Sequence, residues 1–284
     1  MLKLVNNSIF FKIVINALHE SLDELNIYHD VVENYSLDDD HVYLICTTHE
    51  NRSLPKRYIS YNFEQLTTNK VWNPSFFEQL RKAELVFDYS LENIKELEKY
   101  NIKAHFLPLG YSKTMENNIC NKKIDKTVDF SFVGWVNNYR KDKLKSLIDK
   151  YEGSKDKLVI TGDCWGENLN NLYEKTKFGL NIHFYTGRTI LEVHRIIPLI
   201  ANKVLVISEK SNDSWYDEKY NNLIDYFETN NYEIECLRLL ENYNSDIIEK
   251  RYYDLINNHK YVDYVKNIVH LLKQYNNTEI EPEC

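Results

Sequence analysis

Three stretches in the second half of the chain place chemistry-bearing side chains directly after an apolar run. The first stretch follows Val128–Val133, where Gly134 ends the run and Arg140 opens the next polar segment. A glycine at a strand end lets the backbone approach a phosphate, and an arginine at a helix N-terminus adds positive charge for it. The alternative is that Gly134 only makes a tight turn between a strand and a helix.

The second stretch repeats this arrangement with an aromatic residue. Gly162 follows the apolar run Leu158–Thr161, and Trp165 comes three residues later. An indole ring there could cover a flat base, although a tryptophan in the core or in a lid would give the same pattern. Gly162 is therefore a second candidate binding residue.

The third stretch carries the most ionic residues among apolar ones. Six polar or charged side chains occur along a predicted strand, loop, helix and next strand: Asn181, His183, Arg188, Glu192, Arg195 and Glu209. In this arrangement Arg188 can meet a diphosphate, and Glu192 can accept hydrogen bonds from ribose hydroxyls. The alternative is an internal pair between Glu192 and Arg195 beside a core histidine.

The elements that must position these residues are strands alternating with helices. Short runs rich in β-branched and aromatic residues alternate with amphipathic stretches, which predicts an α/β fold with parallel sheets. The strands are expected at Ile9–Ile15, His41–Thr47, Tyr58–Tyr61, Leu85–Tyr89, His105–Leu107, Val128–Val133, Leu158–Thr161, Phe178–His183, Lys203–Ser208 and Leu223–Phe227. The helices are expected at Ala17–Leu25, Pro74–Arg81, Leu91–Tyr100, Arg140–Tyr151, Leu169–Lys175, Thr189–Ala201, Tyr232–Leu240 and Asp246–Gln274, the last with a break at Asn257–Asn258.

Chain length and a polar segment predict two sheet-centred domains. A chain of 284 residues exceeds the commonest domain size, and the segment Ser112–Lys126 lacks apolar periodicity. We expect an N-terminal domain over residues 1–112, a linker over 113–127, a second domain over 128–245, and a C-terminal helix and tail over 246–284. Because parallel sheets bind ligands beyond the carboxyl ends of their strands, the ligand is expected in a cleft between the two domains.

Composition excludes several classes of protein. The net charge is −8 and the basic residues are scattered, which argues against nucleic acid as a partner. The apolar stretch Ile9–Ile15 contains Lys12 and is too short for a membrane span or a signal peptide, so a cytoplasmic location is expected. The five cysteines form no Cys-x-x-Cys pair, which predicts free thiols instead of a disulfide framework or a structural zinc site.

The run LNIHFYTGRTILEVHRIIPLIANKVLVISE resembles the donor-binding segment of GT-B-type glycosyltransferases. The likeness is greatest to a small bacterial and giant-virus group, in which an Asn-Ile-His strand precedes a Leu-Glu-Val-His-Arg helix. Three N-terminal pieces, Tyr58–Leu66, Phe87–Asn93 and Leu107–Tyr111, fit the same group. Together these pieces extend over most of residues 58–209.

The resemblance implies two Rossmann-like domains that face a central cleft. The second domain would bind a nucleotide-sugar, the first would bind a glycan or another hydroxyl acceptor, and a sugar would pass between them. Helix dipoles and cationic side chains would stabilise the leaving diphosphate, so no metal cofactor is required. The resemblance places Gly134 and Arg140 at the diphosphate, Glu192 and Arg195 at the nucleotide, and Glu64 with Gln65 at the acceptor.

The chain departs from the family pattern where many retaining GT-B enzymes carry two glutamates. The corresponding positions are Ile190 and Pro198, and Lys203 replaces the glycine that follows them. The absence of the second glutamate leaves open a catalytically silent protein that binds a nucleotide or a glycan.

An inverting mechanism would instead need a general base. Its candidates, by residue type and strand-end position, are Glu64, Asp88 and His183. The run Asp38–Asp40 precedes a strand and is interpreted as a solvated loop rather than a metal-binding Asp-x-Asp motif. A Rossmann-type enzyme of other chemistry would need Gly-x-Gly-x-x-Gly after its first strand, and Ile15–His19 supplies none.

Overall fold

The computed structural model describes residues 1–50, 53–117, 125–154, 156–227 and 232–275, and these form two compact units. The first unit comprises Met1–Thr114 together with Lys260–Cys284, and the second comprises Met115–His259. Each unit is built on one parallel sheet, so the α/β class with parallel sheets is confirmed. Of the predicted linker, residues 118–124 lie outside the described residues.

The first unit contains a six-stranded parallel sheet in the order β2-β1-β3-β4-β5-β6. The strands are β1 (Leu2–Val5), β2 (Asp30–Val32), β3 (Val42–Ile45), β4 (Tyr58–Asn62), β5 (Leu85–Asp88) and β6 (His105–Phe106). Every residue of β3 and β4 is buried, as expected for central strands covered on both faces.

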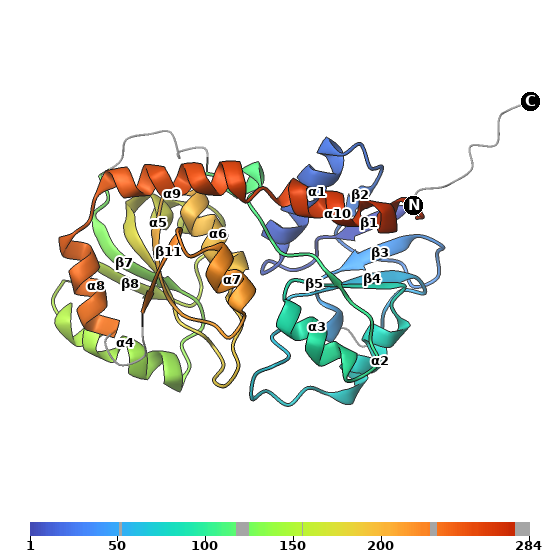
Figure 1. Cartoon of the computed structure of the whole chain (residues 1–284), viewed down its shortest axis with the longest axis horizontal. Helices are drawn as coiled ribbons and strands as arrows, with labels where there is room; N and C mark the ends of the chain where they lie inside the picture. The colour runs from blue at the N-terminus through green and yellow to red at the C-terminus, as the bar shows by residue number, and fades with distance from the viewer. Residues whose placement is uncertain (51–52, 118–124, 155, 228–231, 276–284) are drawn as a thin grey trace, which may run out of the picture. The chain divides into compact units, whose positions relative to one another are not determined.

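Four helices cover this sheet, and Figure 1 shows α1 and α10 on one face with α2 and α3 on the other. They are α1 (Lys12–Glu24), α2 (Pro74–Lys82), α3 (Leu91–Glu98) and α10 (Tyr261–Lys273). The predicted start of α2 is confirmed, because the Asn73 side chain accepts a hydrogen bond from the Ser75 backbone N–H and Pro74 follows it. A short 3₁₀ turn, Thr48–Glu50, lies in the first unit, and a second, Lys113–Met115, lies at its boundary with the second unit.

The second unit contains a five-stranded parallel sheet in the order β11-β10-β9-β7-β8. Its strands are β7 (Val128–Val133), β8 (Leu158–Thr161), β9 (Thr176–Asn181), β10 (Leu205–Glu209) and β11 (Ile224–Phe227). Its helices are α4 (Asn138–Lys150), α5 (Gly166–Lys175), α6 (Val193–Ala201), α7 (Ser214–Lys219), α8 (Tyr232–Glu241) and α9 (Ser245–Asn258).

The strand order of the second sheet reverses direction at β7. Chain order proceeds from β7 to β8 on one side and then returns to β9 on the other side. The carboxyl ends of β7 and β9 therefore flank a topological switch point, the position where open α/β sheets bind ligands. Beneath this edge, Phe130, Phe132, Phe178 and Leu180 form a buried core that fixes the strand ends.

One predicted strand was wrong. Residues 9–15 form a loop followed by the start of α1, and the first strand is Leu2–Val5. The apolar run continues with the helical spacing of Val14, Ala17 and Leu18, all fully buried, and this periodicity outweighs its β-branched content. The corrected loop after the first strand, residues 6–11, also lacks glycine, so it offers no dinucleotide-binding turn.

Other boundaries differ in smaller ways. The short edge strand β2 and the short helix α7 were not predicted. Helix α6 begins at Val193 and not at Thr189, because residues 189–192 still belong to the loop and the N-cap residue Glu192 has a non-helical ψ of +66°. The predicted break in the last helix is confirmed, since α9 ends at Asn258 and α10 begins at Tyr261.

The Asp38–Asp40 run lies in a largely exposed loop before β3, where Asp39 accepts hydrogen bonds from the Tyr43 hydroxyl and the His41 backbone N–H. Within the described residues, no helix combines the length and the apolar character needed to cross a lipid bilayer.

Candidate functional site

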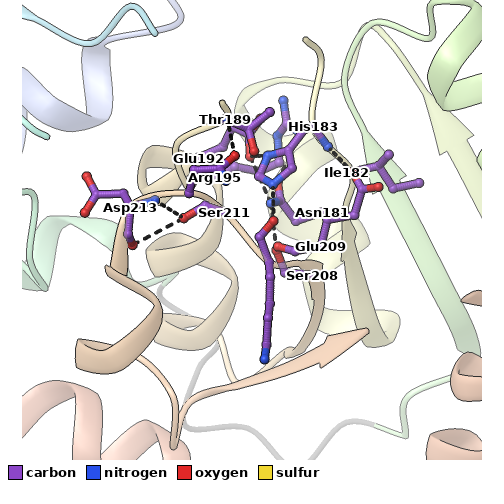
Figure 2. Close-up of polar contacts among 12 residues, drawn as sticks. Asn181, Ile182, His183, Thr189, Glu192, Arg195, Ser208, Glu209, Ser211 and Asp213 are labelled. Carbon is purple, nitrogen blue, oxygen red and sulfur yellow. Dashed lines mark hydrogen bonds and ion pairs between the residues drawn. The ribbon is translucent and has the colours of Figure 1, made fainter. Parts of the chain in front are cut away.

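A cluster of buried ionic side chains lies at the carboxyl edge of the second sheet (Figure 2). Gly134 directly follows β7, Asn181 ends β9, and Glu209 ends β10. Glu192 is the N-cap residue of α6, which connects β9 to β10. The structure thus brings residues from all these elements together at the switch point of the sheet.

The centre of the cluster is an ion pair between His183 and Glu192. The Nδ1 atom of His183 lies 2.9 Å from Oε2 of Glu192, and Nε2 lies 3.1 Å from the Lys210 carbonyl oxygen. The same Oε2 atom accepts a hydrogen bond of 3.0 Å from Nδ2 of Asn181. Because both His183 and Glu192 are less than 5% exposed, the pair is shielded from water.

Burial and charge act in opposite directions on this pair. Burial lowers the pKa of His183, but the charge of Glu192 and the hydrogen bond to it outweigh burial and raise the pKa to about 9. Burial raises the pKa of Glu192, but His183, Arg195 and Arg140 together hold it well below its usual range. Both side chains are therefore ionised at neutral pH.

Glu209 forms the second anionic position. Its Oε2 atom accepts a hydrogen bond of 2.8 Å from the His183 backbone N–H, and Oε1 accepts one of 2.5 Å from the Tyr139 hydroxyl. The ammonium group of Lys143 lies 3.9 Å from Oε1. Glu209 thus fixes the end of β9 relative to β10 and to α4.

Arg140 is almost fully buried and joins two strand ends. Its Nε and Nη2 atoms donate to the Ile182 carbonyl oxygen at 2.9 and 2.7 Å, and Nη1 donates to the Trp135 carbonyl oxygen at 2.8 Å. Burial and the neighbouring Arg195 lower its pKa to about 10, so the guanidinium keeps its charge at neutral pH. Arg140 therefore contributes positive charge to the site while its donors hold the loop after β7.

Arg195 and Gly134 lie against each other. The Nη1 atom of Arg195 donates to Oδ1 of Asn181 at 3.3 Å, and Nη2 lies 3.2 Å from the point that a Cβ atom of residue 134 would occupy. Gly134 has a φ of +152°, which favours glycine. Gly162 is adjacent, since a Cβ atom there would lie 3.7 Å from the Gly134 carbonyl oxygen.

The charges of the cluster do not balance. Arg140, Arg195 and protonated His183 carry positive charge, whereas Glu192 and Glu209 carry negative charge. The N-terminus of the 13-residue helix α4 adds a further positive potential beside Gly134, with Asn137 as its N-cap. An anionic ligand placed here would meet a net positive, largely dehydrated environment.

Arg188 differs from the buried cluster in its exposure, although it falls between His183 and Glu192 in the sequence. It is exposed in the loop between β9 and α6. That loop is anchored at Thr189, whose backbone N–H donates to Oδ1 of Asn212 at 3.0 Å and whose carbonyl oxygen accepts from the Asn212 N–H at 2.8 Å.

The first unit positions the two remaining candidate bases differently. Glu64 is partly accessible, with 21% of its side chain exposed, and its oxygens lie 3.2 Å from Nε2 of His49 and 3.5 Å from Nζ of Lys70. Asp88 is fully buried and accepts hydrogen bonds from Asn62, Asn93 and the Ser90 backbone N–H. A proton acceptor for a substrate must be reachable, which favours Glu64.

Two asparagines connect Asp88 to the backbone of Glu64. The Nδ2 atoms of Asn62 and Asn93 each donate to both the Asp88 carboxylate and the Glu64 carbonyl oxygen, over 2.7 to 3.1 Å. Asp88 therefore holds the loop that carries Glu64, and neighbouring Gln65 is buried. Sequence reasoning gave Asn62 and Asn93 no role, although Asn62 directly follows the predicted strand Tyr58–Tyr61 and Asn93 lies in the predicted helix Leu91–Tyr100.

The second unit also contains site residues that sequence reasoning missed. Ser208 accepts a hydrogen bond of 2.9 Å from Nδ2 of Asn181, and Tyr139 donates to Glu209. Ser208 could have been found from the sequence, because it is a polar residue within the apolar run before Glu209. Nothing in the spacing distinguished Tyr139 from the chain's 22 tyrosines.

A cavity of about 680 Å³ opens at the ends of β1 and β2 in the first unit. Its lining is rich in amide and hydroxyl groups and comprises Asn6, Asn7, Ser8, Ile9, Lys12, Val31, Val32, Glu33 and Asn34. The volume lies in the range of pockets that bind small molecules.

Comparison with known sequences finds a distant relative. No protein-family model matches the chain. An uncharacterised protein of Acanthamoeba polyphaga mimivirus is 29% identical over 162 residues, which cover 56% of this chain and 54% of the relative. The chain therefore aligns with only about half the length of that relative.

Comparison with solved structures identifies the fold. AviGT4, a glycosyltransferase involved in avilamycin A biosynthesis, superposes with a TM-score of 0.61 at 13% identity, over 96% of this chain and 97% of that chain. An α-glucosyltransferase solved with UDP and a 13-mer DNA gives a TM-score of 0.57 at 11% identity, over 96% and 98%. A sucrose-phosphate synthase from Thermosynechococcus elongatus gives 0.57 at 10% identity, over 96% and 98%. The chain has the fold of the GT-B-type glycosyltransferases.

Proposed function

We propose that this protein is a glycosyltransferase that moves a sugar from a nucleotide-sugar donor to a glycan or another hydroxyl acceptor. The single observation that carries the proposal is the net positive, buried cluster at the switch point of the second sheet. A nucleoside diphosphate supplies the negative charge that this cluster lacks. The glycosyltransferase-like fold supports the same assignment.

In this proposal the diphosphate lies beside Gly134 at the N-terminus of α4. Because Gly134 has no side chain, the Arg195 guanidinium lies directly against its backbone, and a diphosphate at the helix N-terminus would meet this cation. Arg140 acts through its charge, because its donors are engaged with carbonyl oxygens. Developing negative charge on the leaving diphosphate is stabilised by these fixed cations without any rearrangement.

Glu192 is a positioning residue in this scheme. It holds His183 protonated and orders Asn181, which in turn accepts a hydrogen bond from Arg195. Glu192 was also expected to accept hydrogen bonds from ribose hydroxyls. For that role its buried carboxylate would have to contact the ligand in addition to His183 and Asn181. Exposed Arg188, in the loop before α6, is assigned to the outer part of the donor.

Glu64 is the general base that we assign to the acceptor hydroxyl. Of the three candidates it is the accessible one, whereas Asp88 and His183 are buried and hydrogen-bonded. The amide-rich cavity at the ends of β1 and β2 offers donors and acceptors that suit a polyhydroxylated acceptor. Its position at strand ends is the usual one for a ligand in a parallel sheet.

Calorimetry with a panel of nucleoside diphosphates tests the donor site. We expect at least one of UDP, GDP, ADP and CDP to bind, and Arg195→Gln to weaken that binding at least tenfold. Arg238→Gln is the matched control, because Arg238 is an exposed arginine on α8 that pairs with Glu235. Failure of every nucleotide to bind would remove the basis of the proposal.

Turnover separates the enzyme from the alternative of a silent nucleotide-binding protein. That alternative is favoured by Pro198, which stands in place of a family glutamate. Slow hydrolysis of the matching nucleotide-sugar, lost in Glu64→Gln without loss of nucleotide binding, would support the enzyme. Tight nucleotide binding with no hydrolysis or transfer of any donor sugar would support the silent protein.

A further inference from the structure

Two histidines and an aspartate converge on one point in the first unit. His19 and Asp23 are one turn apart on α1, and His29 immediately precedes β2. The Nδ1 atom of His19 lies 2.8 Å from Nε2 of His29 and 3.6 Å from Oδ2 of Asp23, and Nε2 of His29 lies 3.9 Å from Oδ1 of Asp23. One ligand atom from each residue lies within 4.8 Å of the others.

The orientation of His29 is set by the backbone. Its Nδ1 atom lies 2.7 Å from the Ile27 carbonyl oxygen, which can only accept a hydrogen bond, so Nδ1 carries the proton. The Nε2 atom therefore presents its lone pair toward His19 and Asp23. A ring whose second nitrogen donates to a carbonyl oxygen is the usual arrangement of a metal-bound histidine.

The three side chains differ in exposure, so one of them is held in place and the other two can change conformation. The His29 side chain is 1% exposed, whereas the side chains of His19 and Asp23 are 46% and 61% exposed. Two nitrogen ligands on a tetrahedral zinc ion lie about 3.3 Å apart, given zinc–nitrogen bonds of about 2.0 Å. The exposed His19 ring can supply the difference from 2.8 Å by a small rotation.

We propose that His19, Asp23 and His29 bind one divalent transition-metal ion of the zinc type. Imidazole nitrogens with a carboxylate suit zinc, and three protein ligands leave a fourth position for water. Magnesium and calcium prefer oxygen ligands and fit this set poorly. The proposal is independent of the sugar-transfer assignment, because none of the three residues belongs to the donor site or lines the cavity assigned to the acceptor.

Such an ion would fasten an edge of the sheet. Strand β2 is three residues long, lies at the end of the strand order, and follows a turn in which Asn26 has a φ of +53°. The ion would join this strand to α1 at the point where the chain reverses. Zinc should therefore protect the first unit against thermal unfolding.

Zinc titration of the tag-free, full-length chain tests the proposal. We expect one zinc ion per chain in competition with a chromogenic chelator, and binding at least tenfold weaker in His19→Ala. His270→Ala is the matched control, because His270 is exposed on α10 of the same unit and lies outside the cluster. Asp23→Asn gives a second variant that leaves the buried His29 untouched.

The outcomes are distinct. Zinc binding and a raised melting temperature in the wild type and in His270→Ala, with both reduced in His19→Ala and Asp23→Asn, would support the site. Absence of zinc binding at micromolar concentration would leave only a hydrogen bond between His19 and His29, and the proposal would be wrong. Unchanged zinc affinity in both cluster variants would place the ion elsewhere and overturn the assignment.

Discussion

The ion pair between His183 and Glu192 makes a quantitative prediction about stability and pH. The pKa of His183 is about 9 in the folded chain against 6.5 for an ordinary histidine. A group with a raised folded pKa stabilises the fold fully below its unfolded pKa, and this contribution is lost as the pH rises to the folded pKa. As the pH rises from 6.5 to 9, the free energy of unfolding should therefore fall by about 3 kcal/mol because of this histidine, at about 1.4 kcal/mol per pKa unit.

Glu192→Gln is the perturbation that isolates this effect. The amide keeps the shape of the side chain but removes the charge that holds the proton on His183. Because burial alone lowers the pKa of a histidine, His183 in the variant should be neutral at pH 7. The variant's free energy of unfolding should then lack the decline between pH 6.5 and 9 that the wild type shows.

Urea unfolding at several pH values measures this difference. Trp135, Trp165 and Trp215 belong to the second unit, so a Trp72→Phe background restricts the fluorescence signal to that unit. NMR titration of the His183 imidazole gives the pKa directly. A wild-type His183 that titrates near 6.5, or identical pH profiles for the wild type and Glu192→Gln, would refute the reasoning.

Three further predictions concern two glycines and a cysteine in close-packed surroundings. Gly134→Ala introduces a Cβ atom 3.2 Å from Nη2 of Arg195 at a φ of +152°, so unfolding experiments should show a loss of about 1–3 kcal/mol and calorimetry should show weaker nucleotide binding. Gly179→Ala places a Cβ atom 2.6 Å from a Leu199 methyl group and should destabilise by about 1–3 kcal/mol. Leu199→Ala in the same chain should recover part of this loss, and additive losses would contradict the contact. Burial raises the pKa of the Cys236 thiol to about 12, so mass spectrometry after native thiol labelling at pH 8 should find this residue unmodified.

Much of the second unit could be predicted from the sequence because its strands are short apolar runs that end at polar residues. β7 and β8 match their predicted ranges, and the residues at the carboxyl ends of β7, β9 and β10 converge as the rule for parallel sheets requires. Gly134, Asn181 and Glu209 were found in this way. Their partners across the sheet edge depend on strand order, which sequence spacing does not give.

The first unit was harder to predict at its start. The run Ile9–Ile15 satisfies the strand pattern locally, and only its continuation through Leu22 reveals the helical period. β2 has exposed or half-buried residues in a three-residue strand, so it lacks the apolar signature of a central strand. The cluster of His19, Asp23 and His29 also escaped detection, because its third member lies across the turn that connects α1 to β2.

The charge state of His183 could not be predicted from the sequence. Glu192 and Arg195 were expected to help hold the nucleotide, with an internal pair between them beside a core histidine as the alternative. The structure instead shows His183 placed between Glu192 and the Glu209 carboxylate, which accepts from the His183 backbone N–H. These contacts convert a neutral residue type into a third cation, and the positive surplus that carries the proposed function follows from it.

The position of Pro198 agrees with a site in which the carboxylate of α6 lies at the N-terminal end of the helix. Pro198 is buried inside α6, where a glutamate would stand in many retaining enzymes of the GT-B type. A proline in a helix interior removes one backbone donor and cannot itself bind a ligand through charge. Any carboxylate that acts on the nucleotide from α6 must therefore lie at its N-terminal end, where Glu192 is held by His183 and Asn181. The loss of nucleotide affinity in Glu192→Gln, compared with that in Arg195→Gln, would show whether the carboxylate acts on the ligand itself or only through the cations that it orders.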